Sequence, residues 1–143
     1  MAEEVAEIFS KHIFSSKYED LSEKTIKQLK VFLLDTIGVG IAGSTGSKLN
    51  ELKKIAHTWS KGKNCTVLGT WDKFSRDAST LINAYQIHCL EFDCIHEGAV
   101  VHPMAAILSS LLAHCEEINN LGHHTNGKEF LISLALGCLL YTS

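Results

Sequence analysis

The residues best suited to chemistry lie in one stretch of sixteen residues that begins at His88 and ends at Pro103. It contains three histidines, three carboxylates and two cysteines. Imidazole and carboxylate groups accept and donate protons near neutral pH, which makes them the commonest acids and bases in enzymes. We expect this stretch to join two helices, and catalytic groups concentrate on loops held by rigid elements. It is therefore the first candidate for a functional site.

His102 is the strongest single candidate for a catalytic residue. It immediately precedes Pro103, a residue that favours the first turn of a helix, so His102 lies at or next to the helix N-cap. The positive end of a helix dipole disfavours an imidazolium and favours the neutral ring. A neutral imidazole can accept a proton or donate its N–H to a carbonyl oxygen. The alternative is that His102 only caps the helix, and position alone leaves both interpretations open.

Glu91 and Asp93 are two further catalytic candidates, separated by the apolar residue Phe92. If the chain is extended here, both carboxylates face one side and Phe92 is buried on the other. The two carboxylates could then orient His102 or His96, or bind a hydroxyl group of a substrate. The alternative is that both are solvated surface groups.

The remaining histidines and acids have simpler interpretations. His88 is expected at the end of a helix, three residues before Glu91, where a histidine is more often a hydrogen-bonded packing residue than a catalyst. Glu97 is expected to be a solvated surface carboxylate. Surface or capping roles are predicted for the other five histidines, which are His12, His57, His114, His123 and His124.

The same stretch contains metal-ligand residue types, but their spacing matches neither a paired CxxC nor an HExxH pattern. We therefore predict no metal ligands and no cofactor. A metal-dependent hydrolase that uses the cluster from His88 to His102 remains a less favoured alternative. Cys94 is a poor candidate nucleophile, because no helix N-terminus obviously follows it to lower the pKa of its thiol.

The pattern of apolar residues predicts an all-α fold. Only one proline interrupts the chain, and apolar residues recur every three or four positions over most of it. Ser22 is predicted to be an N-cap, and Asn126 with Glu129 resembles a capping box. One short extended segment is expected at 65–69 and a loop at 91–101. The six expected helices span residues 3–15, 23–41, 48–60, 76–90, 103–119 and 131–140.

Composition excludes several classes of protein. The net charge is −3 and no basic block occurs, so neither nucleic acid nor an anionic membrane is an expected partner. Five cysteines without a CxxC pair and an acidic N-terminus without a signal-peptide pattern predict reduced thiols and a cytoplasmic protein. The most apolar stretch, Phe130 to Tyr141, has 12 residues, whereas a bilayer-spanning helix needs about 20.

The chain of 143 residues is long enough for one domain. Its strongly apolar last helix is expected only three residues before Ser143, and a domain rarely ends without partners for such a helix. We therefore expect residues 1–143 to be a single helical domain that is the incomplete N-terminal part of a larger one. The alternative is that this helix packs into its own core.

Several segments together resemble one known family. They are Leu33–Val39 with Ala42–Ser44, then Thr66–Gly69, and then the run from Asn83 through the candidate site to Pro103. In order and spacing, this chain is similar to the MmgE/PrpD family of 2-methylcitrate dehydratase-like and cis-aconitate decarboxylase-like enzymes. The resemblance extends from about residue 14 to residue 140. Each segment is weakly specific alone, but the combination is specific.

This resemblance implies a large helical domain, a smaller α/β lid domain that is absent from this chain, and a homodimer at full length. It also implies a cofactor-independent lyase or epimerase that moves a proton at the carbon next to a carboxylate of a small di- or tricarboxylic acid. The family's catalytic lysine and further histidine would lie beyond Ser143. The 143-residue chain alone is therefore expected to be inactive.

The resemblance also assigns roles to individual residues. His102 falls on the family's active-site histidine, Asp93 on an aspartate, and Glu91 on a position where the family commonly has aspartate. His96 agrees with a subset of members, and His96 and His88 are the expected substrate-binding residues.

Two positions depart from the family pattern. Cys94 replaces a third aspartate, and Ile95 replaces a threonine whose hydroxyl would face the substrate. The loss of a hydrogen bond at such a position changes which substrate is preferred.

A non-catalytic helical module that binds a partner through its exposed apolar helix is the main alternative function.

Overall fold

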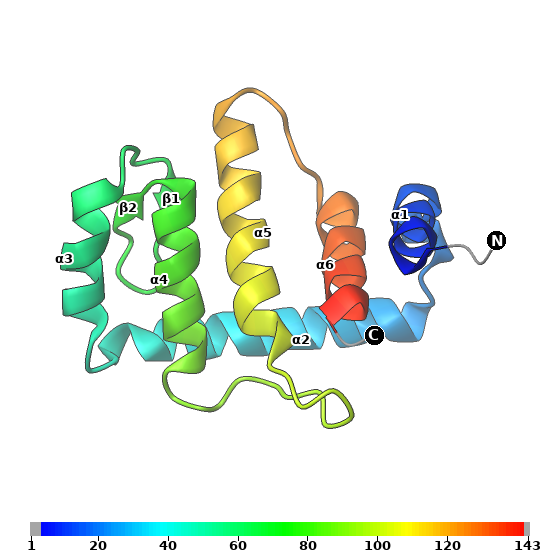
Figure 1. Cartoon of the computed structure of the whole chain (residues 1–143), viewed down its shortest axis with the longest axis horizontal. Helices are drawn as coiled ribbons and strands as arrows, with labels where there is room; N and C mark the ends of the chain where they lie inside the picture. Colours follow the sequence, from blue (N-terminus) through cyan, green and yellow to red (C-terminus); the bar gives the residue numbers. More distant parts are fainter. Residues whose placement is uncertain (1–3, 142–143) are drawn as a thin grey trace.

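The computed structural model describes residues 4–141, and the all-α prediction is confirmed. Figure 1 shows the helices, with a small antiparallel hairpin of two strands between α3 and α4. The helices and 3₁₀ segments are α1 (Val5–Ser15), η1 (Tyr18–Asp20), α2 (Glu23–Ala42), η2 (Gly43–Thr45), α3 (Leu49–Trp59), α4 (Arg76–His88), α5 (Pro103–Asn120) and α6 (Gly127–Tyr141). The strands are β1 (Cys65–Thr66) and β2 (Lys73–Phe74).

The long helix α2 forms the base of the fold. Helices α3, α4, α5 and α6 stand side by side on one side of α2, as Figure 1 shows, and α4, α5 and α6 each pack against it. The most extensive helix–helix packing is between α4 and α5. The loop that connects these two helices holds the candidate site residues, so their packing brings the two ends of that loop together.

The predicted capping residues are confirmed at two helix starts. The Ser22 hydroxyl accepts a hydrogen bond from the Thr25 backbone N–H at 3.1 Å, which caps α2. At the start of α6, the Asn126 side chain accepts from the Glu129 N–H at 3.0 Å, and the Glu129 carboxylate accepts from the Asn126 N–H at 2.9 Å. This reciprocal pair is a capping box, and it starts α6 at Gly127, four residues before the predicted position.

The structure differs from the predicted helix and strand bounds near the candidate site and at the hairpin. Helix α4 ends at His88 instead of 90, which puts the whole segment from Cys89 onward into the loop. The predicted extended segment at 65–69 is regular only at Cys65–Thr66. Strand β2 was not predicted, because its two residues give no periodic signal. The predicted start of the first helix at residue 3 lies outside the described residues.

The core has two parts. One joins α3, α4 and the hairpin, and the other joins α2, α5 and α6 through the buried side chains of Leu29, Met104, Leu108, Leu131 and Leu134. Helix α6 packs against α2 and α5 along most of its length, as far as Cys138, whereas Leu139 and Leu140 near its end are exposed. Within residues 4–141, no single helix is both long and apolar enough to cross a bilayer, and only the sharply bent pair of α2–η2 and α3 reaches that length and composition together.

Close contact between α2 and α4 depends on one glycine. A Cβ atom at Gly43, which follows α2, would overlap the backbone carbonyl oxygen of Gln86 in the last turn of α4. The Gln86 side chain reinforces this contact by donating to the carbonyl oxygens of Leu68 at 2.9 Å and Gly40 at 3.3 Å. Since His88 is two residues further along α4, this contact fixes where His88 lies.

Replacing Gly43 by alanine should therefore destabilise the protein. Because the added methyl group meets backbone, which cannot rotate away, we expect Gly43→Ala to lower the free energy of unfolding by about 1–3 kcal/mol. The matched control is Gly38→Ala within α2, where no heavy atom lies within 4 Å of the added Cβ. That variant should gain about 0.5–1 kcal/mol from helix propensity. Thermal unfolding followed by circular dichroism checks both, and equal effects of the two substitutions would contradict this role of Gly43.

Candidate active site

A buried carboxylate lies at the centre of the candidate site. The Asp93 side chain has no exposed surface, and its two oxygens face two histidines from different helices. Its Oδ1 and Oδ2 lie 3.1 and 3.3 Å from Nδ1 of His88, the last residue of α4. Its Oδ2 lies 3.3 Å from Nδ1 of His102, the residue before α5. The structure therefore brings together three predicted site residues, His88, Asp93 and His102.

The two imidazole rings also contact each other. Their centroids are 4.9 Å apart and the planes meet edge to face at 66°. With both Nδ1 atoms directed at Asp93, the Nε2 atom of each ring is the nitrogen left for other partners. A carboxylate that accepts from Nδ1–H fixes the tautomer and the orientation of an imidazole, as Asp93 does for His88. The Nδ1 of His102 lies 3.3 Å from the same carboxylate.

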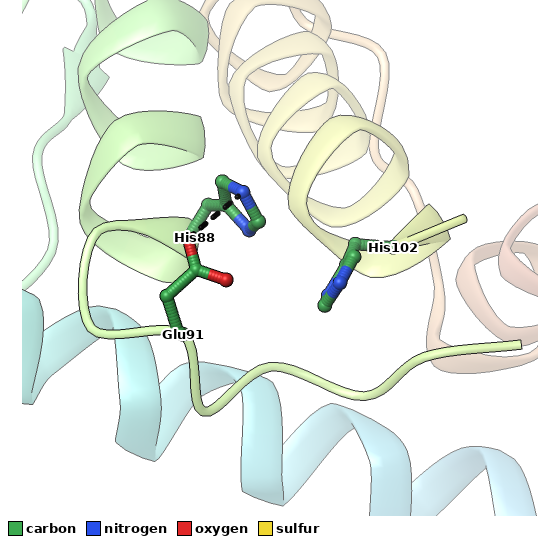
Figure 2. Close-up of side chains that lie close together, drawn as sticks. All are labelled: His88, Glu91 and His102. Carbon is green, nitrogen blue, oxygen red and sulfur yellow. Dashed lines mark ion pairs between the residues drawn. The ribbon is translucent and has the colours of Figure 1, made fainter. Parts of the chain in front are cut away.

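Glu91 joins the cluster from the solvent side. Its Oε1 lies 3.6 Å from Nε2 of His88, and its side chain is 76% exposed. Figure 2 shows Glu91 and His88 paired, with His102 facing them from the start of α5. The backbone of Glu91 has a φ of 54°, in the left-handed region that residues other than glycine rarely adopt. This strained turn directs the Glu91 carboxylate back toward the end of α4.

The predicted burial of Phe92 is wrong. Its side chain is 77% exposed, because the left-handed turn at Glu91 replaces the extended backbone that would have put Phe92 on the opposite face from the carboxylates. Both carboxylates nevertheless lie beside the His88 ring: Glu91 faces its Nε2 and Asp93 faces its Nδ1. His88 lies at the end of a helix and is hydrogen-bonded, as predicted, but its side chain is 46% exposed and is therefore only partly packed.

His102 occupies the predicted N-cap position, with Pro103 as the first residue of α5, but its side chain does not cap the helix. Its Nδ1 is buried and makes no hydrogen bond, since the approach to Asp93 at 3.3 Å is close enough but not aligned. An unsatisfied buried nitrogen costs free energy, which a residue kept only as a cap would not need to bear. Simple capping therefore does not explain why a histidine stands here.

A hollow of about 410 Å³ opens beside the two imidazoles. Its other lining residues are small or aliphatic, namely Ala84, Val100, Val101, Ala105 and Ala106. The alanines on α4 and α5 leave room next to the imidazoles that larger side chains would fill. The sequence pattern did not indicate this role for them, because alanines at helical spacing are ordinary packing residues.

His96 lies apart from this cluster. Its Nδ1 accepts a hydrogen bond from the Ala99 N–H at 3.1 Å, and its backbone pairs with Val101. It lines a second, more apolar cavity of about 230 Å³ together with Cys94, Ile95 and Met104. The structure therefore does not bring the predicted substrate-binding residue His96 together with His88.

The cysteines near the site are poorly suited to be nucleophiles. Burial, followed by the charges of Asp35 and Asp93, raises the pKa of the Cys94 thiol above its usual value. Burial raises the pKa of Cys138, in the same cavity, to about 11. Neither thiol is held in the reactive thiolate form near neutral pH. This agrees with the sequence-based argument against a Cys94 nucleophile.

Three of the site residues could also hold a metal ion. One ligand atom each from His88, Glu91 and His102 lies within 4.8 Å of the other two. The linear spacing of these residues, 88, 91 and 102, matches no common ligand pattern, so the sequence left a metal site in this cluster only as a less favoured alternative.

Comparisons with known proteins agree with this description. A family model for the MmgE/PrpD N-terminal domain matches residues 7–138. The chain is 27% identical over 124 residues to a cis-aconitate decarboxylase-like protein of Aspergillus oryzae, covering 85% of this chain and 26% of that protein. It is 28% identical over 119 residues to the cis-aconitate decarboxylase of Homo sapiens, covering 82% of this chain and 24% of that protein. The chain thus spans about a quarter of the length of these curated relatives.

If Asp93 holds the two histidines together, its removal should weaken the fold. Asp93→Ala removes the hydrogen bond to His88 Nδ1 and creates a small cavity, so we expect the free energy of unfolding to fall by about 1–3 kcal/mol. Glu97→Ala removes an exposed carboxylate from the same loop and should change stability by less than about 0.5 kcal/mol. Urea denaturation measures both, and an Asp93→Ala effect as small as that of Glu97→Ala would contradict the central place of Asp93.

Proposed function

This chain belongs to the MmgE/PrpD family, and from that premise we propose that it is part of a cofactor-independent lyase or epimerase for a small di- or tricarboxylic acid. The observation that carries the proposal is the pair of imidazoles oriented by the buried Asp93 carboxylate at the edge of an open hollow. Dehydration, decarboxylation and epimerisation all require a proton to be removed from or delivered to a carbon atom next to a carboxylate. An imidazole with one free nitrogen is suited to that task.

In this proposal His102 is the acid–base residue. Its Nδ1 faces Asp93, so Nε2 is free to exchange a proton with the substrate. An imidazole can take up a proton from the substrate and later return it. Asp93 is a positioning residue, and Glu91 and His88 lie where they can contact the substrate or hold the proton in transit.

The substrate carboxylates need partners that the cluster lacks. Removing a proton next to a carboxylate builds negative charge on the carboxylate oxygens, which donors or cations must stabilise. The cluster of His88, Glu91, Asp93 and His102 contains no lysine or arginine. Since the chain spans about a quarter of its curated relatives, we propose that cationic groups elsewhere in the whole protein complete the site.

The relatives provide a first substrate to test. Two of them are named cis-aconitate decarboxylases, and a third is named cis-aconitate decarboxylase-like. Cis-aconitate is a tricarboxylic acid of the proposed class. Ile95 cannot donate a hydrogen bond, so we propose that this protein prefers a substrate whose polar groups differ from those of cis-aconitate at that point.

Replacing His102 tests the proposal in the whole enzyme to which this domain belongs. Because the proton donor or acceptor is lost, His102→Ala should reduce turnover of the carboxylic-acid substrate at least about a hundredfold. Deuterium exchange at the carbon next to the carboxylate, followed by proton NMR in D₂O, measures the proton-transfer step directly and should slow by the same factor. Glu97→Gln, on the same loop but outside the cluster, is the control and should stay near the parent rate. Near-normal turnover and exchange in His102→Ala would overturn the role of His102.

A further inference from the structure

We propose that His88, Glu91 and His102 form a binding site for a divalent transition-metal ion, with Zn²⁺ as the best fit. One ligand atom from each residue lies within 4.8 Å of the others, at the junction of α4, the loop and α5 (Figure 2). Two imidazole nitrogens and one carboxylate are a common ligand set for zinc sites that keep an open fourth position. This inference does not depend on the proposed function, because it concerns binding by the described residues alone.

The environment behind the two imidazoles supports this site. A histidine that binds a metal usually directs its other ring nitrogen to a carboxylate or carbonyl group. Here the buried Asp93 carboxylate faces Nδ1 of both His88 and His102, at 3.1 and 3.3 Å. That arrangement leaves both Nε2 atoms as the ligand nitrogens. A single buried carboxylate therefore orients two ligands at once.

Glu91, the third ligand, can move as far as the ligand atoms must to surround a metal ion. Ligand atoms at about 2.0–2.2 Å from a tetrahedral zinc lie roughly 3.4 Å from one another, so a separation of 4.8 Å must shrink by about 1.4 Å. The Glu91 carboxylate already lies 3.6 Å from His88 Nε2, and its side chain is 76% exposed and can rotate. The left-handed backbone of Glu91 keeps it on this side of the loop.

Charge and ligand chemistry select the class of metal. The carboxylates of Glu91 and Asp93 carry two negative charges, which a divalent ion would balance, and one of them is completely buried. Two imidazole ligands favour zinc, cobalt, nickel or copper over magnesium and calcium, which prefer oxygen ligands. Three protein ligands leave one position for water or for an oxygen atom of a small ligand.

Metal binding would compete with proton transfer. The Nε2 lone pair of His102 that would accept a proton is the same one that would bind the ion. A bound metal therefore blocks the acid–base role of His102, and Zn²⁺ is expected to inhibit the whole enzyme if the proposed function is correct.

The test is a calorimetric titration of the metal-free 143-residue chain with ZnCl₂. The parent chain should bind one Zn²⁺ at this site, and Glu91→Gln and His88→Gln should each weaken that binding about 10–100-fold or abolish it. Matched controls are Glu97→Gln and His124→Gln, which remove the same kinds of group from exposed positions outside the cluster. Both controls should bind Zn²⁺ like the parent. Titration with CoCl₂ gives a second readout, since the visible absorption of tetrahedral Co²⁺ should be lost in the same two variants.

Two results would overturn the site: no Zn²⁺ binding by the parent chain, or the same affinity in Glu91→Gln as in Glu97→Gln. If His88→Gln fails to fold, the result for Glu91→Gln is the one to use. The Glu91 side chain is exposed, so its variant is expected to fold, and far-ultraviolet circular dichroism will check that it keeps its helices. The titration contains no substrate and measures no turnover. A negative result therefore leaves the acid–base role of His102 standing, and a failed activity test leaves the metal site standing.

Discussion

The buried carboxylate of Asp93 is the constraint on which the site depends. A carboxylate without exposed surface is costly unless charged or hydrogen-bonding groups face it. The partners within 3.3 Å are the imidazoles of His88 and His102, which come from the end of α4 and the start of α5. These two helix ends must therefore meet at Asp93. The contact of Gly43 with the backbone of α4 holds one of them in place.

The same geometry suits two kinds of chemistry for one physical reason. When Nδ1 of an imidazole faces a carboxylate, its Nε2 is left as a well-oriented lone pair. Such a nitrogen can bind a proton or a metal ion, and the groups around it decide which. Here Glu91 adds a negative charge beside His88, whereas small side chains such as Ala105 keep the hollow open beside His102. The cluster can therefore bind either a proton or a metal ion.

The sequence predicted the elements better than the site. Apolar periodicity and capping residues such as Ser22 and Asn126 identified the helices, because these signals are local. The sequence also placed His102 before a helix-starting proline and Asp93, with Glu91, in the loop between two helices, and the structure brings His102 and Asp93 within 3.3 Å of each other. The left-handed backbone at Glu91 was not, and it reversed the predicted burial of Phe92. That conformation is set by how the loop closes between two packed helices, which no local pattern records.

The most direct test of the account is the tautomer of the two site histidines, read from long-range ¹H–¹⁵N correlation spectra of the chain at a pH where both rings are neutral. If Asp93 orients both rings, His88 and His102 should each carry the proton on Nδ1 and leave Nε2 bare. An exposed ring such as that of His124 should show the Nε2–H form that free imidazole side chains prefer, and it provides the reference. Finding Nε2–H in both His88 and His102 would contradict the account, because neither ring would then donate to the buried carboxylate.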